Sequence, residues 1–309
     1  MNATIFLRTI KIICFLLLMC IQSSASAQDD FSGWWENDTL VAKSNGFAPE
    51  NVANIGRARA LARRAAMMDG YRQLAEQAKG IHITAETTIG EKIVAGDIVE
   101  GKVDAVVKGA KILSEEYDEF GNCTLVMAVP IYGVTDSVAN VTFKPVDKEN
   151  FPKPSAKIKS SGNYTGLIID CGDADITPVL SPVIRNAKNQ SIYSYSNLDY
   201  EKVLANGMVG YAKNDSVTLP VIKNFMPLSY AKLIENKLLL VTNVSVKNNL
   251  SRAGDNPLII TAESLSDGNS CPVVSISDAD KILAENQASH FLDNGAVVFV
   301  SHRVGGVRA

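Results

Sequence analysis

The most regular hydrophobic pattern of the chain lies between residues 49 and 79. Small and apolar residues recur there every three or four positions, which places them on one face of an α-helix. Pro49 suits the first turn of such a helix, and Gly80 can end it. The predicted apolar face contains Ala53, Gly56, Ala60, Met67, Tyr71, Leu74 and Ala78, and Leu61, Ala65, Met68 and Ala75 widen it. Because many of these residues are small, we expect the helix to pack closely on a sheet.

Alternating patterns around this helix predict the strands of that sheet. Ile81 to Ile89 alternates between apolar and polar residues, as a half-buried strand does. Two further strand-like runs are joined by Phe120-Gly121-Asn122 into a hairpin. Residues 93–107 are ambiguous and are compatible with a second helix. The predicted strands are residues 39–43, 81–89, 108–119 and 123–132. Together these patterns predict a long helix laid across an antiparallel sheet of four strands.

The second half of the chain also mixes strand and helix patterns. Ser277 is placed to cap a helix that runs to about Leu292, with Asp280 where a capping box has an acid. Lys188-Asn189-Gln190 and Asn294-Gly295 are predicted turns. The predicted strands are residues 164–171, 179–186, 191–195, 237–247, 258–265, 273–276 and 296–301. The predicted fold class is α+β in both halves.

Between the halves lies a segment with little apolar content and no sustained period. Residues 143–162 read FKPVDKENFPKPSAKIKSSG, with three prolines and several lysines. Such a segment stays extended and solvated because it buries too little surface to offset the entropy of ordering. The predicted organisation is a signal peptide at 1–27, a helix-on-sheet domain at 28–142, a linker at 143–162 and an α+β domain at 163–309.

The first 27 residues have the pattern of a secretory signal. Arg8 and Lys11 precede the apolar run Ile12–Ile21, and Ala25-Ser26-Ala27 forms a cleavage site of small residues. An apolar run of that length is too short to cross a bilayer, which needs about 20 helical residues. Lipid attachment at Cys20 is the alternative, but Met19 is not the small residue that normally precedes a lipidated cysteine. We therefore predict an exported protein, periplasmic or associated with the outer membrane.

The charge balance limits the class of partner. After removal of the signal the chain has 28 basic and 33 acidic residues, a net charge of −5. This balance argues against nucleic acid and against electrostatic docking on anionic lipid. No segment of the mature chain is long and apolar enough to span a membrane. The arginines between 57 and 72 on the long helix are expected to form a solvated or ion-paired face.

Candidate catalytic chemistry is sparse. The three histidines do not cluster, and Cys123, Cys171 and Cys271 have neither metal-ligand nor disulfide-framework spacing. Two of these cysteines could form a bridge, but we favour three buried thiols. Asp170, Asp173 and Asp175 crowd one loop, where turn chemistry explains them better than metal or acid–base chemistry. We predict no catalytic, cofactor-binding or metal-binding residues and no enzyme activity.

Four motifs in the first half resemble the lipoprotein-20 family of bacterial envelope proteins, which includes FlgP-like proteins and to which FlgT-like ring proteins look related. They are Arg57-Ala-Arg-Ala-Leu-Ala-Arg-Arg-Ala-Ala, Asp69-Gly-Tyr-Arg-Gln-Leu-Ala-Glu, Val107-Lys-Gly-Ala-Lys and Met127-Ala-Val-Pro-Ile-Tyr-Gly. The resemblance covers residues 36–133. Residues from Tyr164 onward look like a companion domain found with this module. The family implies an SHS2- or dodecin-like domain and a non-enzymatic role.

The function that follows is a structural or assembly protein of the cell envelope, with the flagellum as one expected site of association. A periplasmic module that binds a ligand or peptide between two domains is the alternative. Envelope proteins, or a second copy of the chain, are the expected partners, with the N-terminal sheet as the contact surface. Its hairpin carries the apolar residues Ile112, Val126, Ala128 and Val129, and an open sheet has unpaired edges.

Overall fold

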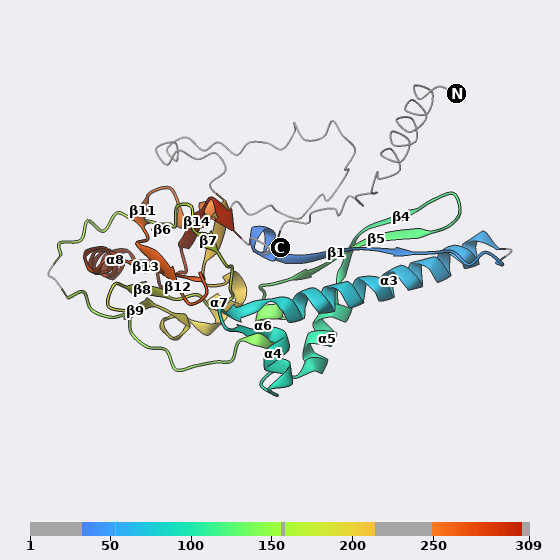
Figure 1. The fold of residues 1–309 in the computed structure, drawn as a ribbon, viewed down its shortest axis with the longest axis horizontal. Coiled ribbons are helices and arrows are strands. Elements are labelled where there is room, and N and C mark those ends of the chain that lie inside the picture. The colour runs from blue at the N-terminus through green and yellow to red at the C-terminus, as the bar shows by residue number, and fades with distance from the viewer. Residues whose placement is uncertain (1–32, 53, 156–157, 214–248, 305–309) are drawn as a thin grey trace, which may run out of the picture. The chain divides into compact units, whose positions relative to one another are not determined.

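Helices and strands are mixed throughout the chain (Figure 1). The computed structural model describes residues 33–52, 54–155, 158–213 and 249–304. Its content of 34% helix and 27% strand confirms the α+β class. The predicted signal peptide and the predicted strand at 237–247 lie outside the described residues.

In the described residues of the first half, one long helix packs on a three-stranded antiparallel sheet, and a separate two-stranded hairpin follows the helix. The sheet has the strand order β1-β5-β4, and α3 runs along one of its faces (Figure 1). The elements are α2 (Trp34–Asn37), β1 (Thr39–Gly46), α3 (Ile55–Gly80), β2 (His82–Thr84), β3 (Thr87–Thr88), α4 (Ile89–Val94), α5 (Glu100–Lys108), β4 (Lys111–Tyr117), β5 (Cys123–Pro130) and α6 (Val138–Thr142). The predicted helix and hairpin are confirmed.

The buried face of α3 differs from the predicted one. Its buried residues are Ala58, Ala62, Ala66, Gly70, Leu74 and Ala78, each four positions after the last. Of the main predicted face only Leu74 and Ala78 are buried, whereas Gly56 and Ala60 are exposed. Four residues are slightly more than one turn, so this row drifts around the helix by about 40° per step and can follow a twisted sheet. The prediction was wrong because it gave the larger residues Met67 and Tyr71 the central position.

The predicted strand at 81–89 is broken. His82–Thr84 and Thr87–Thr88 form a separate two-stranded hairpin with a turn between them, and Ile89 begins α4. Thr88 caps α4, since its hydroxyl accepts from the Glu91 amide while the Glu91 carboxylate accepts from the Thr88 amide. This capping box competes with continued strand pairing. The N-terminal sheet therefore has three strands and not the predicted four.

Alternation in the hairpin strands decides which side chains reach α3. Val129 is fully buried on the helix side, and Ile112 lies opposite Met127, which is also fully buried. Val126 and Ala128 point to the other face of the sheet. The prediction that all four apolar residues offer a docking surface was therefore wrong for Ile112 and Val129. It was also wrong for Ala128, which is only 6% exposed, so Val126 is the one of the four that is half-exposed on that other face.

The described part of the second half contains two four-stranded sheets. One is parallel, in the order β10-β14-β6-β11, and the other is mixed, in the order β12-β13-β8-β9; β7 and β15 pair separately. The elements are β6 (Gly166–Asp170), β7 (Asp175–Ile176), β8 (Ile184–Asn186), β9 (Ser191–Tyr193), η1 (Tyr195–Asn197), α7 (Tyr200–Asn206), β10 (Gly210–Lys213), η3 (Asn249–Ala253), β11 (Pro257–Thr261), β12 (Ser264–Ser266), β13 (Cys271–Val274), α8 (Ile276–Ser289), β14 (Val297–Ser301) and β15 (Arg303–Val304).

The start and the end of α8 differ from the prediction. Ser275, not Ser277, caps this helix by accepting from the Asp278 amide at 3.0 Å. Asp280 is buried and accepts two hydrogen bonds of 2.6 Å, from the amide and the hydroxyl of Ser155. The helix ends at Ser289, and His290 follows in the left-handed conformation. Asp280 therefore fixes the preceding segment of chain rather than its own helix end.

The described residues of the predicted linker, 143–155 and 158–162, have no regular secondary structure, and the two ends of the linker make different contacts. Residues 144–150 are exposed, as predicted for a solvated segment. At the other end the Glu285 carboxylate accepts from the amides of Ser161 and Gly162 and from the Ser160 hydroxyl. The later part of the segment is thus tied to α8, which the composition did not predict.

Candidate functional site

Three regions of the described chain are candidates for function. The first is the face of the N-terminal sheet opposite α3. In β1, Leu40, Ala42, Ser44 and Gly46 are buried toward the helix, and the residues between them point the other way. In Figure 1, α3 runs along one face and no described helix runs along the other. Val126 is central on this open face, opposite Lys43 of β1 and Ser114 of β4.

The two outer strands of this sheet, β4 and β1, differ in the features that oppose pairing with an additional strand. β4 carries the exposed charged residues Lys111, Glu115 and Glu116, and charges on an edge strand oppose the addition of another strand. Arg63 of α3 covers part of β4 through a 2.9 Å ion pair with Glu115. On β1, the Gln77 amide donates to the Val41 carbonyl at 3.0 Å. The open face is thus a better contact surface than the β4 edge.

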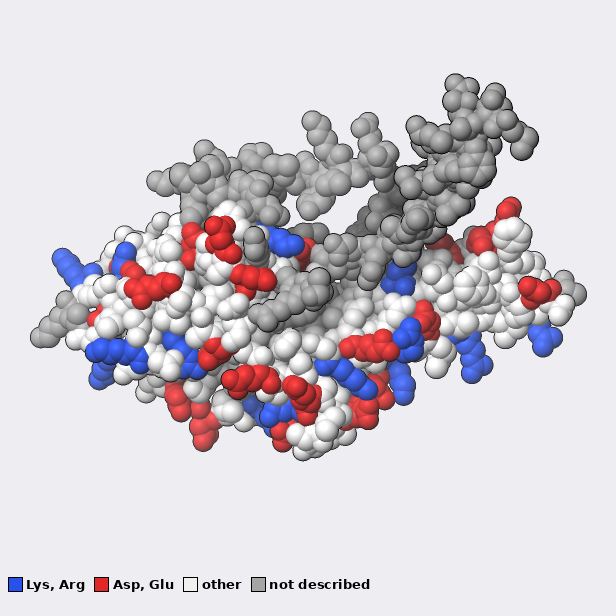
Figure 2. Space-filling model, in the orientation of Figure 1, with Lys and Arg blue, Asp and Glu red and all other residues white. Residues whose placement is uncertain are grey.

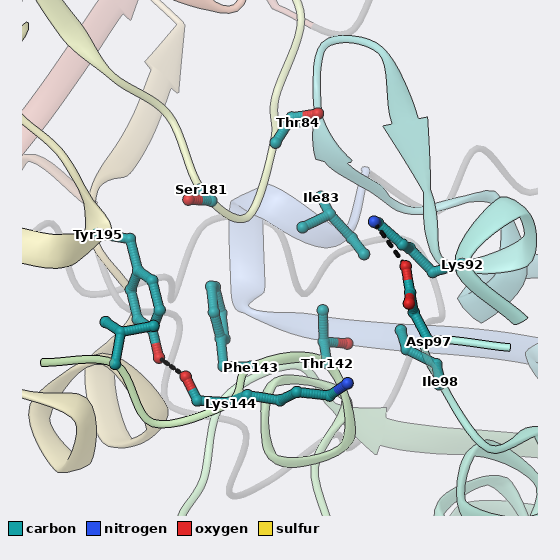
Figure 3. A pocket seen from close by; sticks show the side chains of 11 residues that line it. Ile83, Thr84, Lys92, Asp97, Ile98, Thr142, Phe143, Lys144, Ser181 and Tyr195 are labelled. Atoms are coloured by element: carbon teal, nitrogen blue, oxygen red, sulfur yellow. Dashed lines mark hydrogen bonds and ion pairs between the residues drawn. The ribbon is translucent and has the colours of Figure 1, made fainter. Parts of the chain in front are cut away.

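The second region is a cleft of about 370 Å³ where the two halves meet (Figure 3). Backbone hydrogen bonds build this junction, because Leu180 and Ser181 donate to the carbonyls of His82 and Ile83 at 2.9 and 2.8 Å. The cleft is lined by Ile83, Thr84, Lys92, Asp97, Ile98, Thr142, Phe143, Lys144, Val146, Ser181 and Tyr195. It therefore uses residues from both sides of the predicted linker and from the linker itself.

The cleft combines apolar walls with a few charged groups. The Phe143 and Tyr195 rings lie 4.9 Å apart, and the Tyr195 hydroxyl donates to the Lys144 carbonyl at 2.6 Å. The Lys92 ammonium donates to Asp97 at 2.8 Å, and this hydrogen bond and the positive charge lower the pKa of the Asp97 carboxyl. Figure 3 shows the Lys144 side chain extending beneath Thr142. This arrangement suits a ligand that is partly apolar and carries an anionic group.

Comparison with known families assigns the two halves of the chain separately. Residues 41–129 match the LPP20 lipoprotein family. This match confirms the resemblance predicted for residues 36–133, and it indicates an envelope-associated protein. Residues 166–303 match a family described as the second domain of Treponema pallidum Tp0624. No curated protein matches the chain.

The LPP20-like segment contains both the open sheet and the helix that covers it, so the family match falls on the first candidate region. Arg72 lies on the solvated side of α3 and pairs with Asp69 and Glu76 at 2.9 Å, whereas Arg63 is half-buried and pairs with Glu115 of β4. This agrees with the predicted ion-paired face. None of the described helices is long and apolar enough to cross a bilayer.

The third region is the loop after β6 in the half that matches Tp0624. The Asp170 carboxylate accepts from the Gly172 amide at 2.9 Å, which is turn chemistry, while Asp173 is exposed and Asp175 begins β7. Among the described residues no group of histidines, cysteines and acids is arranged to hold a metal ion. The three aspartates therefore do not converge on a site.

The cysteines of the described chain are three buried thiols. Cys123, Cys171 and Cys271 are not bridged. Burial raises the pKa of all three, in the case of Cys171 to about 12. A thiol with a raised pKa is a weak nucleophile at neutral pH, because the thiolate is the reactive form.

Sequence reasoning missed the cleft. Its walls come from the β2 hairpin, the α4–α5 connection, the linker and η1, segments that are far apart in the chain. No spacing rule connects them. The one available signal was the pair Phe143-Lys144 at the start of the linker, an aromatic and a basic residue where the chain otherwise turns polar.

Proposed function

We propose that the protein is a non-enzymatic structural component of the bacterial cell envelope, which assembles through the open face of its N-terminal sheet. The observation that carries this proposal is a three-stranded sheet with a long helix on one face and, among the described residues, no helix on the other. One-sided sheets commonly bury their second face by packing on another element. The match of this same segment to a lipoprotein family of the envelope supports the assignment.

The proposed partner surface is centred on Val126. Replacing this residue by aspartate places a carboxylate opposite Lys43 on the neighbouring strand, which the isolated molecule should tolerate as a cross-strand pair of opposite charge. At an interface the same carboxylate would be buried without solvent, at a cost of several kcal/mol. Val126→Asp is therefore expected to prevent assembly while leaving the fold unchanged.

The test is light scattering on the mature chain from residue 28. We expect the wild type to be larger than a monomer at tens of micromolar and Val126→Asp to be monomeric, with unchanged circular dichroism. Val94→Asp is the matched control, because Val94 is 90% exposed on α4 and should not alter assembly. A monomeric wild type that recovers no partner on crosslinking would overturn the proposal.

The site within the envelope and a flagellar role belong to the same proposal. The LPP20 match supports the envelope and does not choose between periplasm and outer membrane. We propose a periplasmic or outer-membrane-associated protein, with a flagellar structure as one candidate partner. Fractionation of cells carrying a tagged chain, followed by crosslinking, tests both points; recovery of the tag in the cytoplasm alone would contradict them.

The cleft favours one alternative, a module that binds a small ligand or peptide. Its apolar walls and the Lys144 side chain suit a short peptide with an apolar C-terminal residue and a free carboxylate. A pool of such tripeptides, followed by saturation-transfer NMR on the mature chain, tests this. Binding that is lost in Lys144→Glu but kept in the exposed control Lys148→Glu would support the alternative, and absence of binding would remove it.

A further inference from the structure

The end of the helix-and-sheet region farthest from the junction displays aromatic side chains to solvent. Phe47 is 77% exposed after β1, Phe120 is 71% exposed in the β4–β5 turn, and Ile55 is 52% exposed at the start of α3. We call these three residues the apolar tip. With 26 residues, α3 separates the tip from the junction by about 39 Å, at about 1.5 Å per residue.

The tip is held in place by specific hydrogen bonds. The Asp118 carboxylate accepts from the amides of Phe120 and Asn122 at 3.0 and 2.8 Å. The Asn122 side chain then accepts from the Ala48 amide at 2.8 Å and so joins the turn to the residue after Phe47. The two phenylalanines are thus presented together by a built turn, and their exposure does not result from an unstructured loop.

The shape and size of the tip limit what it can bind. The exposed fractions of 77%, 71% and 52% together equal about two fully exposed side chains. The tip therefore offers at most about 500 Å² of apolar surface, since one phenylalanine buries about 150–250 Å². A stable protein interface needs about 800 Å² from each partner. The three side chains also come from the end of β1, the β4–β5 turn and the start of α3, and not from one continuous helix or sheet face. Insertion into a lipid bilayer requires neither this interface area nor a continuous matching surface.

The charges around the tip are of both signs (Figure 2). Arg57 and Arg59 lie on the first turns of α3, and Glu50, Asp118 and Glu119 lie in the neighbouring loops. Charged groups of this kind remain in the headgroup layer while apolar side chains enter the acyl boundary. Because three acids outnumber two bases and the tip has no excess of positive charge, the attraction would be hydrophobic and would not depend on anionic lipid.

We propose that the apolar tip inserts into the surface of a lipid bilayer and gives the protein a peripheral membrane contact through Phe47 and Phe120. This inference goes beyond the proposed assembly role and does not require it. It also supplies a membrane contact that is independent of lipid attachment at Cys20, where Met19 departs from the usual pattern.

The test is flotation of the mature chain with phosphatidylcholine vesicles, with and without a fifth of phosphatidylglycerol. We expect the wild type to float with both and the double variant Phe47→Ser, Phe120→Ser to lose about tenfold or more in partitioning, since removing each buried phenylalanine weakens binding severalfold. The control Val94→Ser, Val99→Ser removes two exposed valines of 90% and 61% elsewhere and should float like the wild type.

A variant with a tryptophan in the tip reports insertion directly through its fluorescence. Phe120→Trp should show a blue-shifted emission and quenching by brominated lipid, whereas Trp34 and Trp35, which lie near β10, should not respond. A wild type that does not float, or a double variant that floats equally well, would overturn the proposal. So would a double variant that dissociates oligomers without loss of flotation, because the tip would then be a protein contact. Val126→Asp should float normally, which separates this inference from the assembly proposal.

Discussion

Gly46 lies where β1 crosses α3, and its replacement by alanine tests how closely the helix and sheet pack. A Cβ added at Gly46 would collide with the backbone of Ala62 and Ala66. Backbone atoms cannot rotate away as a side chain can, so the helix itself must move. Gly46 does not have a positive φ, and alanine therefore introduces no strain in its own backbone.

The expected loss of stability in Gly46→Ala follows from two opposing effects. Overpacking a tight core costs about 1–3 kcal/mol, and a collision with backbone belongs at the upper end of that range. Replacing glycine inside a strand returns about 0.5–1 kcal/mol of chain entropy. The net loss in the free energy of unfolding should be about 2–2.5 kcal/mol. For a chain of this size, that lowers Tm by about 5–10 °C.

Urea denaturation followed by circular dichroism measures this loss. Two glycines of α3, Gly70 and Gly80, provide the comparison. At Gly70 the added Cβ would meet the Met127 sulfur at 2.5 Å, which a flexible thioether can relieve, so Gly70→Ala should be nearly neutral. At Gly80 nothing lies within 4 Å, so Gly80→Ala should stabilise by up to about 1 kcal/mol through helix propensity. If Gly46→Ala is no less stable than Gly70→Ala, the close contact of helix and sheet is refuted.

Three further predictions concern the second half and the linker. Arg252 donates to the carbonyls of Asn206, Gly207 and Gly295 at 2.6–2.8 Å, so Arg252→Leu should lower the free energy of unfolding by about 2–4 kcal/mol in urea. Burial raises the pKa of Glu285, but the hydrogen bonds from Ser161 and Gly162 outweigh it, and the net pKa is lowered. Its contribution to stability is therefore present above the ordinary pKa of 4.5 and lost as the pH falls through the folded value; urea curves from about pH 7 to pH 3 should show a shallower decline in Glu285→Gln. Brief trypsin treatment should cut first within residues 144–159, and first cleavage inside α3 would show that this helix is not packed.

The sequence predicted the elements of the first half because their signals are local. The helix, the β4–β5 hairpin and the first strand each depend on periodicity and turn residues within one segment. The break in residues 81–89 was missed because alternation continues through Thr88, whereas the Thr88–Glu91 capping box starts a helix there. A capping box and an alternating strand can share the same residues, and tertiary packing decides between them.

Which face of α3 is buried is determined by residues outside the helix. A row of small residues is buried because Gly46 and the side chains of β5 approach it closely, and the larger residues that usually mark a core face were displaced to its flank. The cleft and the apolar tip were missed for the same reason. Each is assembled from segments that only the folded chain brings together.

Assembly through the open face of the sheet is the central claim, and crosslinking in living cells tests it most directly. A photoreactive phenylalanine analogue at position 126 lies in the proposed contact, and the same analogue at position 94 lies on exposed α4. Irradiation should join the protein carrying the analogue at 126 to a second copy or to another envelope protein, and should give no such product from 94. Equal products from both positions, or none from 126 in a correctly exported protein, would contradict the account.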